Sequence, residues 1–147
     1  MTANVDELLE ADELSTKGMK AFWAGDLHTA ESCLRNSLSI ERRLGLSARM
    51  AADYGILAEI YLQMGALQQA EDALINSLKI SDDPIFTARN YYRYAHLHIK
   101  RQDLTLAEAM AKQSYEASTN VDKRTNESAQ ELRNWILKRT QKKSATP

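Results

Sequence analysis

The sequence has little cysteine, proline or glycine: one, two and five residues in 147. Cys33 has no second cysteine to pair with, so no intramolecular disulfide can form and nothing indicates an oxidising compartment. No apolar run reaches the roughly 18 residues that a transmembrane helix needs, and the N-terminus lacks the basic and then apolar segments of a secretion signal. We therefore expect a cytoplasmic protein that is rich in helix.

An excess of charge of either sign is also absent. The formal net charge is -1, which provides no general attraction for nucleic acid or membranes. The charge is uneven, however: residues 1–14 hold five acids and no base, whereas residues 121–147 hold seven Lys or Arg against three acids. Both ends either keep the protein soluble or provide complementary surfaces for contact between copies.

The motifs of the common enzyme classes are missing as well. There is no phosphate-cradling glycine loop, nucleophile elbow or zinc-ligand cluster. His96 and His98 diverge by about 200° on a helix, so they cannot share a metal ion as an i, i+4 pair could. We expect no catalytic residue, no metal and no cofactor, and hence a protein that is not an enzyme.

A repeated pair of helices is what the sequence does contain. Three times, a small residue on a first helix is followed twelve positions later by an alanine on a second helix. The three pairs are Gly18 and Ala30, Ala58 and Ala70, and Ala95 and Ala107. The same alignment places serines at positions 37, 77 and 114. Small residues where two helices cross let the backbones approach closely, which predicts antiparallel helix pairs.

This pattern resembles the tetratricopeptide repeat, which favours aromatic, Leu, Gly or Ala, Tyr and Ala residues at these offsets. The resemblance covers roughly residues 11–121 and is strongest in the middle copy. The segment 40–45, IERRLG, is similar to the long-helix variant in kinesin light chains and LGN-type scaffolds. The resemblance implies an all-α fold, a right-handed α-solenoid of three helix pairs and a C-terminal capping helix.

The expected organisation is one domain over residues 1–140 with a disordered tail, 141–147. The repeats are expected at about 11–46, 51–84 and 88–121. The seven helices are expected near 5–24, 27–44, 47–64, 67–81, 84–101, 103–118 and 124–140. Asp26, Ser47, Asp83 and Asp103 are the predicted N-caps, and Gly65 is a predicted helix stop. A stripe that includes Ala129, Leu132, Trp135 and Ile136 is expected to cover the third pair.

The resemblance also implies a peptide-binding groove on the first helix of each repeat. The groove residues that we carry over are Met19, Phe22, Trp23, Glu59, Leu62, Gln63, Arg89, Tyr92, Arg93, His96 and Lys100. Arg89 and Arg93 stack on one face and either clamp a carboxylate or are plain surface arginines. Trp23 is either an aromatic anchor for a partner or a residue that packs against its own chain.

The leading hypothesis is a non-enzymatic adaptor that binds a peptide or partner protein in this groove. Hydrophobic side chains of the partner would rest near Met19, Phe22, Trp23 and Leu62, and an acidic or C-terminal group near Arg89, Arg93 and Lys100. One alternative is a self-assembling scaffold, in which the acidic first helix of one copy meets the basic last helix of another. A second is a small chaperone of secreted proteins, and nucleic acid and membrane partners are not expected.

Overall fold

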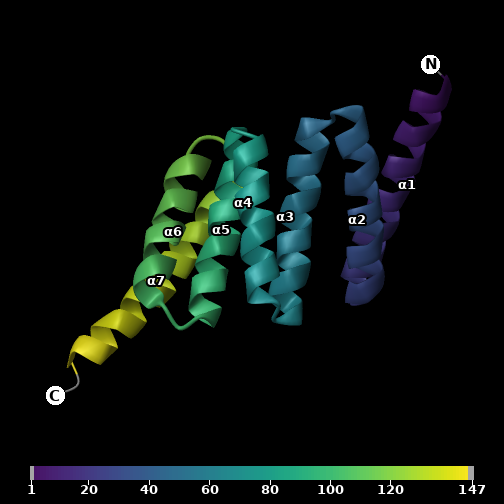
Figure 1. Ribbon diagram of the computed structural model, residues 1–147. Helices are drawn as coiled ribbons and strands as arrows, with labels where there is room; N and C mark the ends of the chain where they lie inside the picture. Colours follow the sequence, from purple (N-terminus) through teal and green to yellow (C-terminus); the bar gives the residue numbers. More distant parts are fainter. Residues whose placement is uncertain (1, 146–147) are drawn as a thin grey trace. The chain divides into compact units, whose positions relative to one another are not determined.

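The computed structural model describes residues 2–145, where all the regular secondary structure is α-helical and the helices pack in sequence (Figure 1). The seven helices are α1 (Thr2–Trp23), α2 (Leu27–Leu44), α3 (Ser47–Met64), α4 (Leu67–Ile80), α5 (Pro84–Lys100), α6 (Leu104–Ser118) and α7 (Lys123–Ala145). The predicted all-α class and number of helices are confirmed. Within this described stretch, no helix combines the length and the apolar character that crossing a membrane requires.

The chain divides into two compact units, which we describe separately. The N-terminal unit, Met1–Ser81, contains α1 to α4, and the C-terminal unit, Asp82–Pro147, contains α5 to α7. In the first unit each helix packs on the next, and in the second α6 packs on both α5 and α7. The solenoid, the repeat boundaries and the single domain stay predictions.

The three helix pairs α1–α2, α3–α4 and α5–α6 are held together by contacts of the same kind. All three anchor alanines of the second helices are fully buried, and so are Ala58 and Ala95 opposite them. Each pair is closed by one buried bond of the same kind, from a serine hydroxyl to a backbone carbonyl 26 residues earlier. The three bonds are Ser37 to Ala11, 3.1 Å, Ser77 to Ala51, 2.7 Å, and Ser114 to Ala88, 2.7 Å.

Gly18 lies close to its partner helix. A Cβ atom at Gly18 would lie 3.1 Å from Cγ of Leu34 and 3.3 Å from Cβ of Cys33. Both neighbours are buried in the core, and the prediction of Cys33 as a small buried residue is confirmed. Glycine at this crossing therefore allows α1 and α2 to pack without displacing Leu34.

The predicted helix caps are confirmed at three of four positions. Asp26, Asp83 and Asp103 each accept a hydrogen bond from a backbone N–H in the first turn of the following helix. The prediction for Ser47 is wrong: Leu46 occupies the N-cap position and makes no side-chain cap bond, while Ser47 begins the helix. Gly65 ends α3 in the left-handed conformation, with φ of 76°.

Helix α7 covers the third pair as predicted, with two differences. Ala129 and Ile136 are fully buried, and Ile136 packs in a cluster with the alanines of α5 and α6. The prediction of Trp135 as a core residue is wrong, because its side chain is 38% exposed. The helix also continues to Ala145, so residues 141–145 of the predicted disordered tail are helical, while 146 and 147 lie outside the described residues.

Candidate functional site

Six of the eleven predicted groove residues lie on α1 and α3. Trp23 is 73% exposed at the end of α1, as an anchor for a partner would be, and not packed against its own chain. Leu62 is buried in the core of the N-terminal unit. The others are half-buried or exposed, namely Met19, Phe22, Glu59 and Gln63. None of the six lines the cavity of this unit that is described below.

The other five predicted residues lie on α5. The Nε atom of Arg89 donates to Asp122 Oδ2 at 3.0 Å, and Nη1 of Arg93 donates to Asn90 Oδ1 at 3.1 Å. A carboxylate held by both arginines would compete with these intramolecular partners. Tyr92 and His96 have a different setting, because both line a cavity.

This cavity, which we call the aromatic cavity, lies between α5 and α7 and has a volume of about 360 Å³. It is lined by Tyr92, His96, Ile99, Ser128, Glu131, Leu132 and Trp135. The rings of Tyr92 and His96 meet edge to face with centroids 4.8 Å apart. The volume is within the range of roughly 300–1,000 Å³ typical of sites that enclose small ligands or side chains.

Trp135 is the residue of this cavity that the sequence analysis missed as a binding residue. The guanidinium carbon of Arg139, one turn later on α7, lies 3.5 Å from the centroid of the Trp135 ring. This cation–π contact helps to hold the indole in place while 38% of the side chain stays exposed. A partner's apolar or aromatic side chain could therefore pack against a prepositioned surface.

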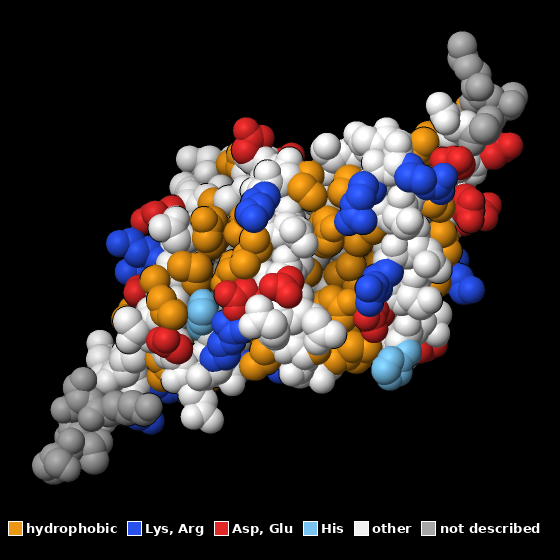
Figure 2. Space-filling model, viewed as in Figure 1, with side chains coloured by type: hydrophobic (Ala, Val, Ile, Leu, Met, Phe, Trp, Pro, Cys, Tyr) orange, Lys and Arg blue, Asp and Glu red, His pale blue; other side chains and the backbone are white. Residues whose placement is uncertain are grey.

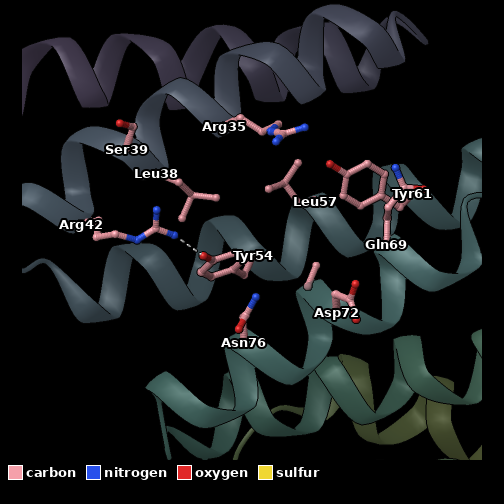
Figure 3. Close-up of a pocket in the computed structure, with 11 residues that line it drawn as sticks. Arg35, Leu38, Ser39, Arg42, Tyr54, Leu57, Tyr61, Gln69, Asp72 and Asn76 are labelled. Atoms are coloured by element: carbon pink, nitrogen blue, oxygen red, sulfur yellow. Dashed lines mark hydrogen bonds between the residues drawn. The ribbon is translucent and has the colours of Figure 1, made fainter.

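The N-terminal unit has an open cavity of its own, which we call the polar groove (Figure 3). It has a volume of about 460 Å³, and α2 and α4 form its walls while α3 forms its floor. The α2 wall contains Arg35, Leu38, Ser39 and Arg42, the floor Tyr54, Leu57 and Tyr61, and the α4 wall Gln69, Asp72, Ala73 and Asn76. In the space-filling view, basic side chains on α2 border an apolar strip in this region (Figure 2).

The tyrosines of the polar groove are held by hydrogen bonds to α2. Nη2 of Arg42 donates to the Tyr54 hydroxyl at 2.7 Å, which positions this guanidinium at the groove. The Tyr61 hydroxyl donates to Glu31 Oε1 at 2.8 Å. Burial and the Glu31 carboxylate raise the pKa of Tyr61 to about 12, so Tyr61 stays neutral and keeps donating at physiological pH.

A buried acidic cluster joins α1, α2 and α3 beneath these surfaces, and the sequence analysis missed it. Ser37 Oγ and Glu41 Oε1 form a hydrogen bond of 3.0 Å, and Ser15 donates to Asp53 Oδ2 at 3.0 Å. Glu41 is only 1% exposed, and its Oε2 has no hydrogen-bond partner among the described residues. Burial, with Asp53 nearby, raises the pKa of Glu41 to about 8. Burial also raises the pKa of Asp53, so this pair retains a proton at neutral pH.

The sequence alignment contained a signal for this cluster. Glu41 occupies the position of Ser118 in the third copy, and Asp53 occupies the position of Asn90. Both positions are buried, so a charge there predicts a perturbed pKa. The cluster lines neither cavity and is best interpreted as part of the packing between α2 and α3.

Within the part of the chain that the structure describes, no three His, Cys, Asp or Glu residues are grouped so that they could hold a metal ion. Compared with known proteins, the chain matches no protein-family model and no curated protein sequence. The class defined by fold and site together is an all-α protein of sequentially packed helices, with the polar groove in one unit and the aromatic cavity in the other.

Proposed function

We propose that this chain is a non-enzymatic protein-interaction module of the tetratricopeptide type, which binds a peptide or a partner protein. The three serine bonds with their common spacing of 26 residues support the repeat on which this proposal rests. We propose that the three pairs form a right-handed solenoid and that residues on the first helices contribute to the binding surface.

One observation carries the proposal more than any other. The offsets of the repeat alone predict Tyr92 and His96 as groove residues. Both line the aromatic cavity together with the exposed Trp135. The rings of Tyr92, His96 and Trp135, with the aliphatic side chains of Ile99 and Leu132, provide a surface against which an apolar or aromatic side chain can pack. We therefore propose that the partner inserts a large apolar or aromatic residue between α5 and α7.

The expected energetics follow from other protein interfaces. Buried aromatic anchors dominate binding, and truncating one commonly costs about 2 kcal/mol or more. Trp135 is held by Arg139 before binding, so little side-chain entropy is lost when a partner covers it. Removing Trp135 should then reduce affinity by at least about thirtyfold.

The test compares two exposed tryptophans on one chain. A partner is first identified by affinity purification and its binding segment is made as a labelled peptide. Affinities are then measured for wild type, Trp135→Ala and Trp23→Ala. We expect Trp135→Ala to lose binding while Trp23→Ala, which removes a residue of the same type from α1, changes affinity less than threefold.

The reverse result would contradict this site. If Trp23→Ala abolished binding and Trp135→Ala did not, the anchor predicted at the end of α1 would be the true one. If neither substitution changed affinity, the aromatic cavity would not be the binding site. Circular dichroism of both variants checks that each remains folded.

A self-assembling scaffold is the second candidate, and the charges on two helices favour it. Asp6, Glu10 and Glu13 on α1 form no salt bridge or side-chain hydrogen bond with the described residues. Residues 132–145 of α7 contain five basic residues and no acid. Contact between these helices in different copies would be heterologous and salt-sensitive. Sedimentation at several concentrations in low salt tests it, and a monomer throughout would rule it out.

A further inference from the structure

The polar groove of the N-terminal unit is lined by two arginines, Arg35 and Arg42, whereas no Lys or Arg lines the aromatic cavity. Eight of its eleven lining residues have a side chain that can form hydrogen bonds; the exceptions are Leu38, Leu57 and Ala73. These three are buried and form an apolar base, whereas the arginines of α2 and the amides of α4 are exposed. The groove therefore has solvent-accessible polar side chains along its walls and this apolar base beneath them.

Polar walls favour an extended segment over a helix as the occupant. A helix has satisfied its own backbone N–H and C=O groups and presents only side chains to a groove. An extended segment has free backbone groups that need partners. Gln69 and Asn76 supply both donors and acceptors along α4, and neither makes a side-chain hydrogen bond with another described residue.

The α2 wall specifies the side chains of such a segment. Arg35 and Arg42 are seven residues apart and face the same groove, which separates them by about 10.5 Å along the helix axis. In the polyproline II conformation every third side chain points the same way, at about 9.3 Å spacing. Acidic side chains at positions i and i+3 of the segment would therefore each meet one arginine.

The existing contacts leave both arginines able to bind. Arg42 uses one of its five N–H donors on Tyr54, which fixes the side chain without neutralising its charge. The Arg35 side chain is 66% exposed, and its ion pair with Glu31 on the same helix is long, 3.4 Å, so a ligand carboxylate would compete with Glu31 for this arginine. Asp72 on the opposite wall accepts a bond from Gln68 at 3.1 Å, and it would repel an acidic side chain on the α4 side. The acids of a ligand should thus point to α2.

We infer that the polar groove binds an extended acidic peptide in the polyproline II conformation, with carboxylates at i and i+3 on Arg42 and Arg35. The half-buried Tyr54 ring between the walls offers an aromatic surface on which a proline of such a segment can pack. This site is separate from the aromatic cavity, and it does not depend on the function proposed for that cavity.

Three labelled peptides test the inference on the full chain by fluorescence anisotropy. They are Pro-Glu-Pro-Pro-Glu-Pro, its Gln counterpart, and Pro-Pro-Glu-Glu-Pro-Pro, which has the same charge with neighbouring acids. We expect the first to bind at least about tenfold more tightly than either of the others, because only its acids match the arginine spacing.

Matched variants locate the site. Arg35→Gln with Arg42→Gln should weaken binding of the first peptide about tenfold, and Asn76→Ala should weaken it by a smaller factor. Lys112→Gln with Arg124→Gln removes the same charge from exposed positions in the C-terminal unit and should have less than a twofold effect. Equal binding of the two acidic peptides, an unchanged affinity of the arginine variant, or tighter binding of an acidic helical peptide would each overturn the inference.

Discussion

The two units hold their helix pairs together in the same way but join the next helix differently. Four residues after the serine that closes a helix pair, the N-terminal unit has Glu41 and the C-terminal unit has Ser118. Glu41 lies with Asp53 of the next helix in a buried acidic cluster. The Ser118 hydroxyl instead accepts a hydrogen bond of 3.3 Å from Asn126 of α7, and both groups are neutral.

This difference concerns how stability responds to pH near neutrality. The bond within each pair uses a serine and a backbone carbonyl, neither of which titrates near neutral pH. At the junction to the next helix, the buried Glu41 of the N-terminal unit has a pKa raised to about 8, whereas the contact between Ser118 and Asn126 in the C-terminal unit does not titrate. Substitutions in the shared core should therefore affect the two units alike, whereas substitutions at the junction should affect them differently.

The largest expected effects come from removing one core side chain in each unit. Leu74 and Ile136 are both fully buried. Leu74→Ala or Ile136→Ala should lower the free energy of unfolding by about 2–5 kcal/mol, because each leaves a cavity. Chemical denaturation gives the size of the effect, and hydrogen exchange measured by mass spectrometry gives its position.

We expect the loss of exchange protection to be greatest in the unit that contains the substitution. Leu74→Ala should expose amides of α3 and α4 first, and Ile136→Ala those of α6 and α7. If either substitution reduced protection equally throughout the chain, the two units would unfold as one. They would then have no separate stabilities to compare.

The next largest effect is expected for Glu41→Gln. The pKa of Glu41 is raised from 4.5 to about 8, so between these values the folded state keeps a proton that the unfolded state has lost. Wild-type stability should therefore fall as the pH rises through this window, by at most about 1.4 kcal/mol per pH unit. The glutamine side chain does not titrate, so the variant should be more stable at pH 8 and show a flatter profile.

Urea denaturation from pH 5 to 8 measures both profiles. Glu116→Gln, an exposed acid on α6, is the control and should leave the slope unchanged. A wild-type stability that did not fall between pH 5 and 8 would mean that Glu41 is ionised in the folded protein, and the contrast between charged and neutral junctions would then disappear.

The shared serine bonds should have smaller effects. Ser77→Ala and Ser114→Ala each remove a buried hydrogen bond of 2.7 Å. Each should cost about 1 kcal/mol, since the carbonyl on the first helix loses one partner. Near-equal losses at the two positions, measured by thermal denaturation, would support one repeated device, and a difference of several kcal/mol would contradict it.

The sequence aligned the residues of this shared device, but it predicted neither their hydrogen bonds nor the differences around them. The helix bounds, the small residues at the crossings and the aligned serines follow from local spacing, which a single sequence contains. Trp135 lies at the edge of the apolar stripe of α7, and its exposure depends on how that helix is rotated against α5 and α6. As acidic residues, Glu41 and Asp53 suggest surface positions in the sequence. The packing of α1, α2 and α3 buries both.

The smallest expected effect concerns an ion pair in the C-terminal unit. Asp122 accepts hydrogen bonds from Thr125 and Arg89, which lower its pKa, the Thr125 hydroxyl contributing most. Arg89→Gln should therefore leave the pKa of Asp122 below its ordinary value, and it should change stability by less than about 1 kcal/mol because Arg89 is half exposed.

A carboxylate with a lowered pKa stabilises the fold above its ordinary pKa, and this contribution is lost as the pH falls. NMR titration of Asp122 in wild type, Arg89→Gln and Thr125→Val distinguishes the two partners. Thr125→Val should raise the pKa of Asp122 more than Arg89→Gln does. The opposite order would make Arg89 the main partner of Asp122. Arg89 would then be less able to leave Asp122 and bind the carboxylate of a ligand.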